Sequence, residues 1–108
     1  MGKGMESLKS ITDAIRSRFD AMDKAREGAI ATSRQITRNS GAAIKAIHRG
    51  EWAEAERLIA GTQSLNYGLR VSLKDFPEVY YSGYVEDAQV ELAEVFVLYS
   101  VLRGQEMP

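Results

Sequence analysis

The sequence predicts an all-α protein, a helical bundle of three long antiparallel helices. Apolar residues recur at the helical period along most of the chain. Only two prolines occur in 108 residues, so few positions lack the backbone N–H that a helix interior needs. Gly50 and the Phe76-Pro77 pair are the strongest breaks. These breaks divide the chain into predicted helices over about residues 5–49, 51–75 and 78–103.

The first predicted helix, residues 5–49, carries an apolar stripe along one face. Its members are Leu8, Ile11, Ile15, Met22, Ala29, Ile36, Ala43 and Ile47. A helix of this length would extend about 65 Å at 1.5 Å per residue. Gly50 directly follows Arg49, and glycine is the usual residue just past the end of a helix. We therefore expect a single long helix that ends at this glycine.

The second predicted helix, residues 51–75, also has an apolar side. It consists of Trp52, Ala55, Leu58, Ile59, Leu65, Leu69 and Leu73. Gly61 and Gly68 weaken this helix, each by roughly 1 kcal/mol relative to alanine. Phe76 should end it, because the residue before a proline avoids the α conformation.

The third predicted helix, residues 78–103, is apolar nearly all round over its last part. The residues involved are Val95, Phe96, Val97, Leu98, Tyr99, Val101 and Leu102. A helix that is apolar on every side is normally buried, and two partner helices cannot surround it. We therefore expect further helices to come from an oligomer or from the rest of a longer protein.

The composition is that of a globular domain, with 44% apolar and 27% charged residues. There is no cysteine, which excludes disulfides and thiolate metal sites. The single histidine, His48, excludes a multi-histidine metal cluster. No secretory signal is recognisable at the N-terminus, and the longest apolar run, Val95–Tyr99, is far shorter than the ~20 residues that span a bilayer. We expect a cytoplasmic protein without membrane contact.

Charge is divided unevenly between the two halves of the chain, although the net charge is only −1. Residues 1–50 carry ten Lys/Arg and five Asp/Glu, a net charge of +5, whereas residues 51–108 carry four and ten, a net charge of −6. Such asymmetry indicates either two surfaces with separate partners or two halves that attract each other on packing.

The basic residues of the first helix are concentrated in its second half. Between Gly28 and Gly50 there is no acid, and there are four bases: Arg34, Arg38, Lys45 and Arg49. At 100° per residue they fall within a sector of about 60°, roughly opposite the apolar stripe. A row of cations on one helix face is typical of proteins that bind a phosphate backbone, although a solvated helix face is the alternative. Hydroxyls of Ser33, Thr37 and Ser40 could add phosphate contacts or be ordinary helix residues.

Acids dominate the third predicted helix, with six acids and no base between residues 75 and 102. Asp87, Glu91 and Glu94 share one face of it, since their spacing is i, i+4, i+7. Neighbouring carboxylates on a largely apolar helix need compensation. Protonation, arginines of the first helix, or a divalent cation could provide it. Oxygen ligands without His or Cys favour Mg²⁺ or Mn²⁺.

Two motifs resemble the translin family, most closely its translin-associated factor X branch. The first is Ser33-Arg-Gln-Ile-Thr-Arg-Asn-Ser40, followed by Ile44 and the His48-Arg49 pair. The second is Gln89-Val-Glu91-Leu-Ala-Glu94, which is similar to the Glu-x-x-Glu of that branch. The resemblance extends over about residues 20–103.

The resemblance implies a subunit of about seven helices that assembles with copies of itself or with translin-like partner subunits into a shell around single-stranded RNA or DNA. Because a family subunit is about twice as long, residues 1–108 would be its N-terminal half. Glu91 and Glu94 would be catalytic ligands of Mg²⁺, or Mn²⁺, and Asp87 a further ligand or a supporting acid. The family's third catalytic acid, an aspartate, would lie in the C-terminal half.

Our leading functional hypothesis is an RNA- or single-stranded-DNA-binding subunit of a Mg²⁺-dependent endoribonuclease, which cuts single-stranded RNA when the full-length protein is assembled. The 108-residue chain alone would then be inactive, because it lacks the third acid. A non-catalytic translin-like subunit is one alternative, in which the acids pair with arginines. A structural module for helical assembly is the other.

Overall fold

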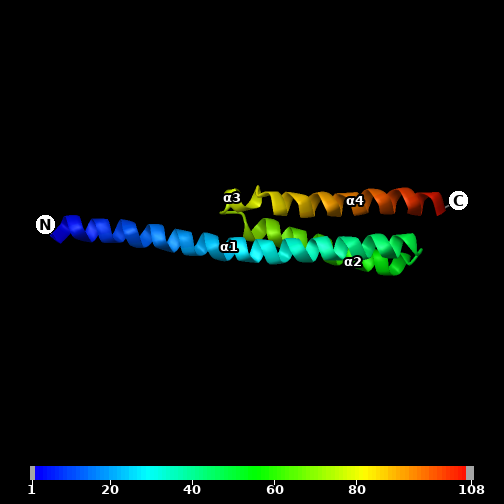
Figure 1. The fold of residues 1–108 in the computed structure, drawn as a ribbon, viewed down its shortest axis with the longest axis horizontal. Helices are drawn as coiled ribbons and strands as arrows, with labels where there is room; N and C mark the ends of the chain where they lie inside the picture. Colours follow the sequence, from blue (N-terminus) through cyan, green and yellow to red (C-terminus); the bar gives the residue numbers. More distant parts are fainter. Residues whose placement is uncertain (1, 107–108) are drawn as a thin grey trace.

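The fold is entirely helical over residues 2–106, which a computed structural model describes, with side chains described as far as residue 104 (Figure 1). The helices are α1 (Gly2–His48), α2 (Trp52–Ser72), α3 (Pro77–Tyr80) and α4 (Gly83–Glu106). The described residues contain no strand, which confirms the predicted all-α class. They extend over 80 × 17 × 15 Å. None of the helices they form is both long enough and apolar enough to cross a membrane.

The first predicted break forms as expected, at Gly50. Its backbone adopts a φ of 71°, in the left-handed region that glycine enters without strain. The Gly50 amide donates to the carbonyl of Ile47 at 3.0 Å, and the Glu51 amide donates to the carbonyl of Ala46 at 2.9 Å. These two bonds satisfy carbonyls at the end of α1 in the Schellman pattern, and the chain then reverses into α2.

The prediction of one helix over residues 78–103 is wrong in detail, because this segment forms two helices. Pro77 starts the short helix α3, and the chain turns at Tyr81 and Ser82 before α4 begins. The Ser82 hydroxyl donates to the carbonyl of Val79, and the Ser82 carbonyl accepts the amide of Glu86 at 3.2 Å. Serine competes in this way with a continuous helical backbone, and Gly83 follows it. The described residues therefore form three long helices and one short one.

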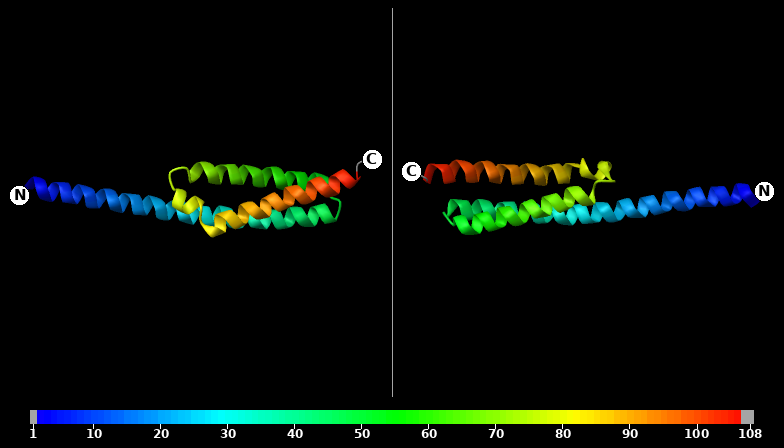
Figure 2. Two further views of the ribbon diagram at one scale, coloured as in Figure 1. Left: turned by 90° about the horizontal axis from the view of Figure 1, so that it is seen from above. Right: turned by 180° about the vertical axis from the view of Figure 1, so that it is seen from behind.

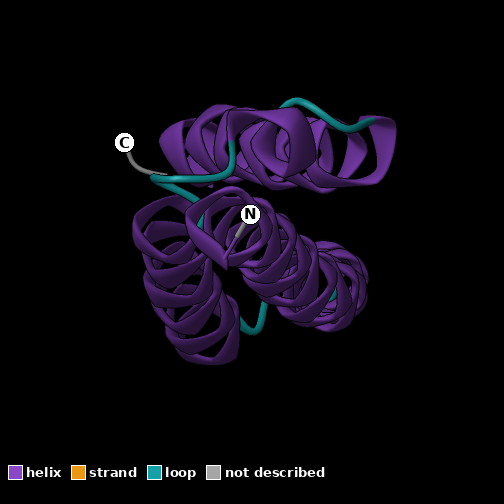
Figure 3. Ribbon diagram, turned by 90° about the vertical axis from the view of Figure 1, so that its left-hand side faces the viewer, coloured by secondary structure: helices purple, strands orange, loops and turns teal. Residues whose placement is uncertain are grey.

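The long helices run up, down and up again. α1 and α2 form an antiparallel hairpin, whereas α4 runs in the same direction as α1 and crosses the hairpin diagonally (Figure 2). In the end-on view, α1 lies beside both of the other long helices (Figure 3). The prediction of antiparallel helices therefore holds for the hairpin of α1 and α2, whereas α1 and α4 run in the same direction (Figure 2).

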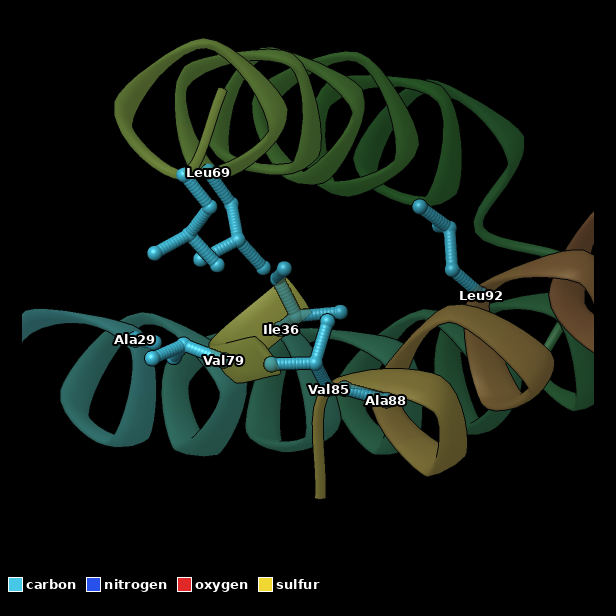
Figure 4. Packing of buried hydrophobic residues seen from close by; sticks show 8 residues of the cluster. Ala29, Ile36, Leu69, Val79, Val85, Ala88 and Leu92 are labelled. Atoms are coloured by element: carbon cyan, nitrogen blue, oxygen red, sulfur yellow. The ribbon is translucent and has the colours of Figure 1, made fainter. Parts of the chain in front are cut away.

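Two apolar clusters hold the helices together. The cluster near α3 contains Ala29, Ile36, Leu69, Leu73, Val79, Val85, Ala88 and Leu92 (Figure 4). The cluster near the hairpin turn contains Ala43, Ala46, Ile47, Ala55, Ile59 and Val95. Several alanines at these contacts let the helix backbones approach closely. Ile36 is fully buried where the three long helices meet.

Two apolar surfaces are left uncovered in this arrangement. Residues 2–21 of α1 are all exposed, and the start of α1 extends beyond the bundle (Figure 1). On α4, the outward-facing side chains of Val90, Val97 and Val101 are at least half exposed. This agrees with the expectation that two partner helices cannot surround the third long helix.

Candidate nucleic-acid interface

The four cations singled out in the sequence are all exposed on the second half of α1. Arg34, Arg38, Lys45 and Arg49 alternate along the helix with the buried residues that pack against α2 and α4. The helical period thus turns the cations to solvent while the core residues face the bundle. α1 is held over this length by both apolar clusters. The cations are therefore carried by a rigid part of the fold.

Three of these four cations have no acidic partner among the described residues. Only Arg49 forms an ion pair, with Glu51 at 3.5 Å. Arg38 donates to the side-chain oxygen of Gln35 at 3.3 Å. Arg34 and Lys45 form no ion pair in the part of the chain that the structure describes.

Three arginines elsewhere on the surface, Arg18, Arg26 and Arg57, are paired with carboxylates, whereas the exposed Arg16 and Arg70 form no ion pair in the described residues. Arg18 lies 3.2 Å from Glu78, Arg26 lies 3.1 Å from Asp23, and Arg57 lies 2.5 Å from Glu54. The positive field along the second half of α1 is therefore less compensated than that around these three arginines.

A groove between α1 and α4 lies beside the first two cations. We call it the α1–α4 groove. It has a volume of about 620 Å³, and it is lined by Ile30, Ser33, Arg34, Thr37, Arg38, Tyr84 and Asp87. Its wall combines guanidinium groups, hydroxyls and an aromatic ring. Asp87 is brought close to the arginines here, but no ion pair within 4 Å joins it to either one.

Two buried hydroxyls of this groove have no hydrogen-bond partner. They belong to Ser33 and Tyr84. An unsatisfied buried hydroxyl is unfavourable by roughly 1–3 kcal/mol, so these atoms favour a ligand or water that can bond to them. Ser33 was already a candidate from the sequence. Tyr84 was not a candidate, because a pattern of apolar positions cannot show that its hydroxyl lacks a partner.

A second groove lies between α1 and α2 and has a volume of about 680 Å³. We call it the α1–α2 groove. Arg38 and Thr37 line both grooves. Lys45 and Arg49 also line the α1–α2 groove, together with Glu51 and Glu54. The hydrogen bond from Arg57 holds the pKa of the Glu54 carboxyl below its ordinary value of 4.5. Each groove therefore combines cations of α1 with acids, Asp87 in the α1–α4 groove and Glu51 and Glu54 in the α1–α2 groove.

The three acids predicted on α4 do not form a compact cluster. Asp87 and Glu94 are exposed, and Glu91 is half-buried. Asp87 alone lines the α1–α4 groove. None of the three forms an ion pair within the described residues, so the alternative of a buried layer of acids and arginines is not formed there.

The donor set for a divalent cation is incomplete in the residues that the structure describes. They contain no group of three His, Cys, Asp or Glu side chains placed to hold a metal ion. Mg²⁺ requires near-octahedral oxygen ligands, and Glu91 with Glu94 supplies two carboxylates at most. The described residues thus do not fit Mg²⁺ or Mn²⁺ by themselves.

Comparison with known proteins gives no match, whether the chain is compared with family models, curated proteins or solved structures.

Proposed function

We propose that this chain is a single-stranded nucleic-acid-binding subunit of the translin type, and that it holds the phosphate backbone along the second half of α1. Arg34, Arg38 and Lys45 would contact successive phosphates, with Arg49 at the end of the row. Ser33 and Tyr84 would add hydroxyl contacts from the α1–α4 groove. Side-chain hydroxyls and arginines are common phosphate ligands in nucleic-acid complexes.

The observation that carries this proposal is the absence of acidic partners. In the described residues Arg34, Arg38 and Lys45 form no ion pair, although the whole chain has a net charge of −1. A face that only had to be soluble would carry both signs of charge. A row of unpaired cations beside buried, unsatisfied hydroxyls is better explained by an anionic ligand that extends along the helix.

The test is RNA binding as a function of salt concentration. Binding of a fluorescent single-stranded RNA to the chain would be followed by anisotropy. The wild type, Arg38→Ala, Lys45→Ala and the double variant would be compared over a range of KCl concentrations. Each lost phosphate contact should reduce the slope of log K against log[salt] by about 0.7 for a single strand.

The control is Arg70→Ala, which removes the same charge from an exposed position on α2. Its slope should equal that of the wild type. If Arg38→Ala and Lys45→Ala also leave affinity and slope unchanged, the cations of α1 are a solvated face. The hypothesis of a structural helical assembly module would then remain.

We further propose that this chain takes part in Mg²⁺-dependent cleavage of single-stranded RNA, and that it does so only as part of a larger assembly. Two adjacent carboxylates favour this idea, since Glu91 and Glu94 lie one helical turn apart on α4 and neither forms an ion pair in the described residues. A third ligand would have to come from outside those residues. A translin-like subunit without catalysis is the competing proposal, and metal-dependent cleavage by the assembly distinguishes the two.

A further inference from the structure

The first part of α1 carries an apolar stripe that nothing in the described chain covers. Its large side chains are 52–72% exposed, and they are Met5, Leu8, Ile11, Ile15 and Phe19. Arg18 contacts Asp75, Phe76 and Glu78, and Met22 is the first residue of α1 that packs against the apolar cluster near α3. A single helix of about this length is marginal in water without a partner, so something should pack on this stripe.

The apolar positions of this segment are arranged symmetrically about Ile15. Ile11 and Phe19 lie four residues away on either side, and Leu8 and Met22 lie seven residues away. If two copies of the segment lie antiparallel with the two-fold axis at Ile15, Ile15 meets the partner's Ile15. Ile11 then meets the partner's Phe19, and Leu8 meets the partner's Met22. Apolar therefore meets apolar in every layer, as a self-complementary two-fold interface requires.

We propose that the first part of α1 is a dimerisation arm, and that a second copy of this chain covers it in an antiparallel helical pair centred at Ile15. The pair would be isologous, so each chain gives and receives the same contacts. The two bundles would lie at opposite ends of the pair. The cations of the second half of α1 would then stay accessible in both copies.

Charged residues beside the stripe fit the same register. On a helical wheel, Lys9, Asp13, Arg16 and Asp20 lie on one side of the stripe, about 80–140° from Leu8. A two-fold axis keeps this side of both helices on the same side of the pair. Lys9 then faces the residue next to the partner's Asp20, and Arg16 faces the residue next to the partner's Asp13. Symmetry makes four such opposite-charge contacts, which favour this orientation over a parallel one.

A groove at the end of the arm nearest the bundle can accommodate the partner helix. Its volume is about 440 Å³, and it is lined by Ala14, Ile15, Arg18, Phe19, Met22 and Glu78. The wall is almost wholly apolar. Arg18 and Glu78 line the groove as an ion pair, and the Arg18 guanidinium lies 4.5 Å from the Phe76 ring centroid. In the register centred at Ile15, Leu8 and Ile11 of the partner subunit enter this groove.

The first experiment measures the mass of the 108-residue chain by light scattering after gel filtration. We expect twice the chain mass of 12.0 kDa. Ile15→Asp should give the single mass, whereas Val97→Asp should leave the dimer intact because Val97 lies on the outer face of α4. A wild-type monomer would overturn the proposal. Loss of the dimer in Val97→Asp but not in Ile15→Asp would also overturn it, and would assign the interface to α4.

The second experiment tests the orientation by cross-linking, which the absence of native cysteine makes simple. Ile15→Cys places two thiols at the two-fold axis, so mild oxidation should link the dimer. In Leu8→Cys the thiols lie seven residues from the axis on opposite sides, about 21 Å apart at 1.5 Å per residue, and no link should form. Efficient cross-linking of Leu8→Cys would indicate a parallel pair and contradict the proposal.

The third experiment separates contacts between chains from contacts within one helix. A chain with Lys9→Asp and Arg16→Asp has only acids on the charged side of the arm. A chain with Asp13→Lys and Asp20→Lys has only bases there. Each chain alone should dissociate at a concentration at least tenfold higher than the wild type, and an equimolar mixture should form a heterodimer. If mixing restores no dimer, the antiparallel register is wrong.

Discussion

The hydroxyl of Tyr99 on α4 donates a hydrogen bond to the Glu56 carboxylate on α2. Gln89 on α4 likewise donates a hydrogen bond to Asn66 on α2, at 2.9 Å. The Tyr99 ring also lies edge-on to Trp52, with centroids 5.8 Å apart. This contact anchors the C-terminal end of α4 to the start of α2.

The Tyr99–Glu56 bond predicts a loss of stability at alkaline pH. The bond to the carboxylate, with some burial, raises the Tyr99 pKa above its ordinary value of 10.0. A group whose pKa is higher in the folded state than in the unfolded state stabilises the fold at pH values below its unfolded-state pKa. This stabilisation is lost as the pH rises through its folded-state pKa. The Tm of the wild type should therefore fall more steeply above pH 10 than that of Tyr99→Phe. Tyr81→Phe, at an exposed position, should follow the wild type, and parallel curves for all three would refute the role of this bond.

Gly50 should be sensitive to substitution because of its backbone conformation. At a φ of 71°, Gly50→Ala should lower the free energy of unfolding by about 1–2 kcal/mol. Gly68→Ala is the matched control, since a Cβ added there meets open space within α2. It should raise stability by up to about 1 kcal/mol. Urea unfolding at fixed protein concentration measures both, and equal effects of the two substitutions would contradict this explanation.

Ile36 should be the most sensitive position of the core. Its side chain is fully buried among Leu69, Val85 and Ala88 (Figure 4). Ile36→Ala should cost about 2–5 kcal/mol of unfolding free energy, because it leaves a cavity where the long helices meet. Val71→Ala, at a position 55% exposed, should change stability by less than about 0.5 kcal/mol. A similar loss in both variants would show that the three helices do not share one cooperative core.

The ion pair of Arg49 should weaken its contribution to nucleic-acid binding. Glu51 holds Arg49 at 3.5 Å, and Glu51→Gln releases that cation. We expect tighter RNA binding and a salt slope that is steeper by up to about 0.7. Glu6→Gln removes the same charge at the far end of α1 and should leave RNA affinity closer to that of the wild type. Anisotropy titrations in KCl compare them, and a greater gain in Glu6→Gln would point to net charge instead of this ion pair.

The chain alone should not use Mg²⁺ or Mn²⁺. Because the described residues offer no three-residue metal site, millimolar concentrations of either ion should leave its Tm unchanged and should not make it cut RNA. In a translin-like assembly that contains the chain, Glu91→Ala or Glu94→Ala should abolish cleavage while RNA binding persists. Cleavage in EDTA, or full activity in either variant, would show that these acids are not metal ligands.

Local patterns in the sequence were sufficient to predict most of the helical structure. The 3.6-residue period of apolar residues predicted the long helices, and Gly50 and Pro77 predicted two of the helix boundaries. Sequence was sufficient here because periodicity and helix breaking each depend on a few neighbouring residues. The turn at Ser82 was missed. This turn includes a hydrogen bond from the Ser82 hydroxyl to the carbonyl of Val79, and such a bond cannot be predicted from the pattern of apolar residues.

The surroundings of each side chain were decided by the tertiary structure. The sequence by itself determined that four cations share one face of α1 and that three acids share one face of α4. Only packing placed Asp87 in a groove with Arg34 while leaving Glu91 and Glu94 out of it, and only packing buried the Tyr84 hydroxyl without a partner. The reason is that periodicity determines which residues share a face of one helix, whereas the angle at which α4 crosses α1 determines which faces meet.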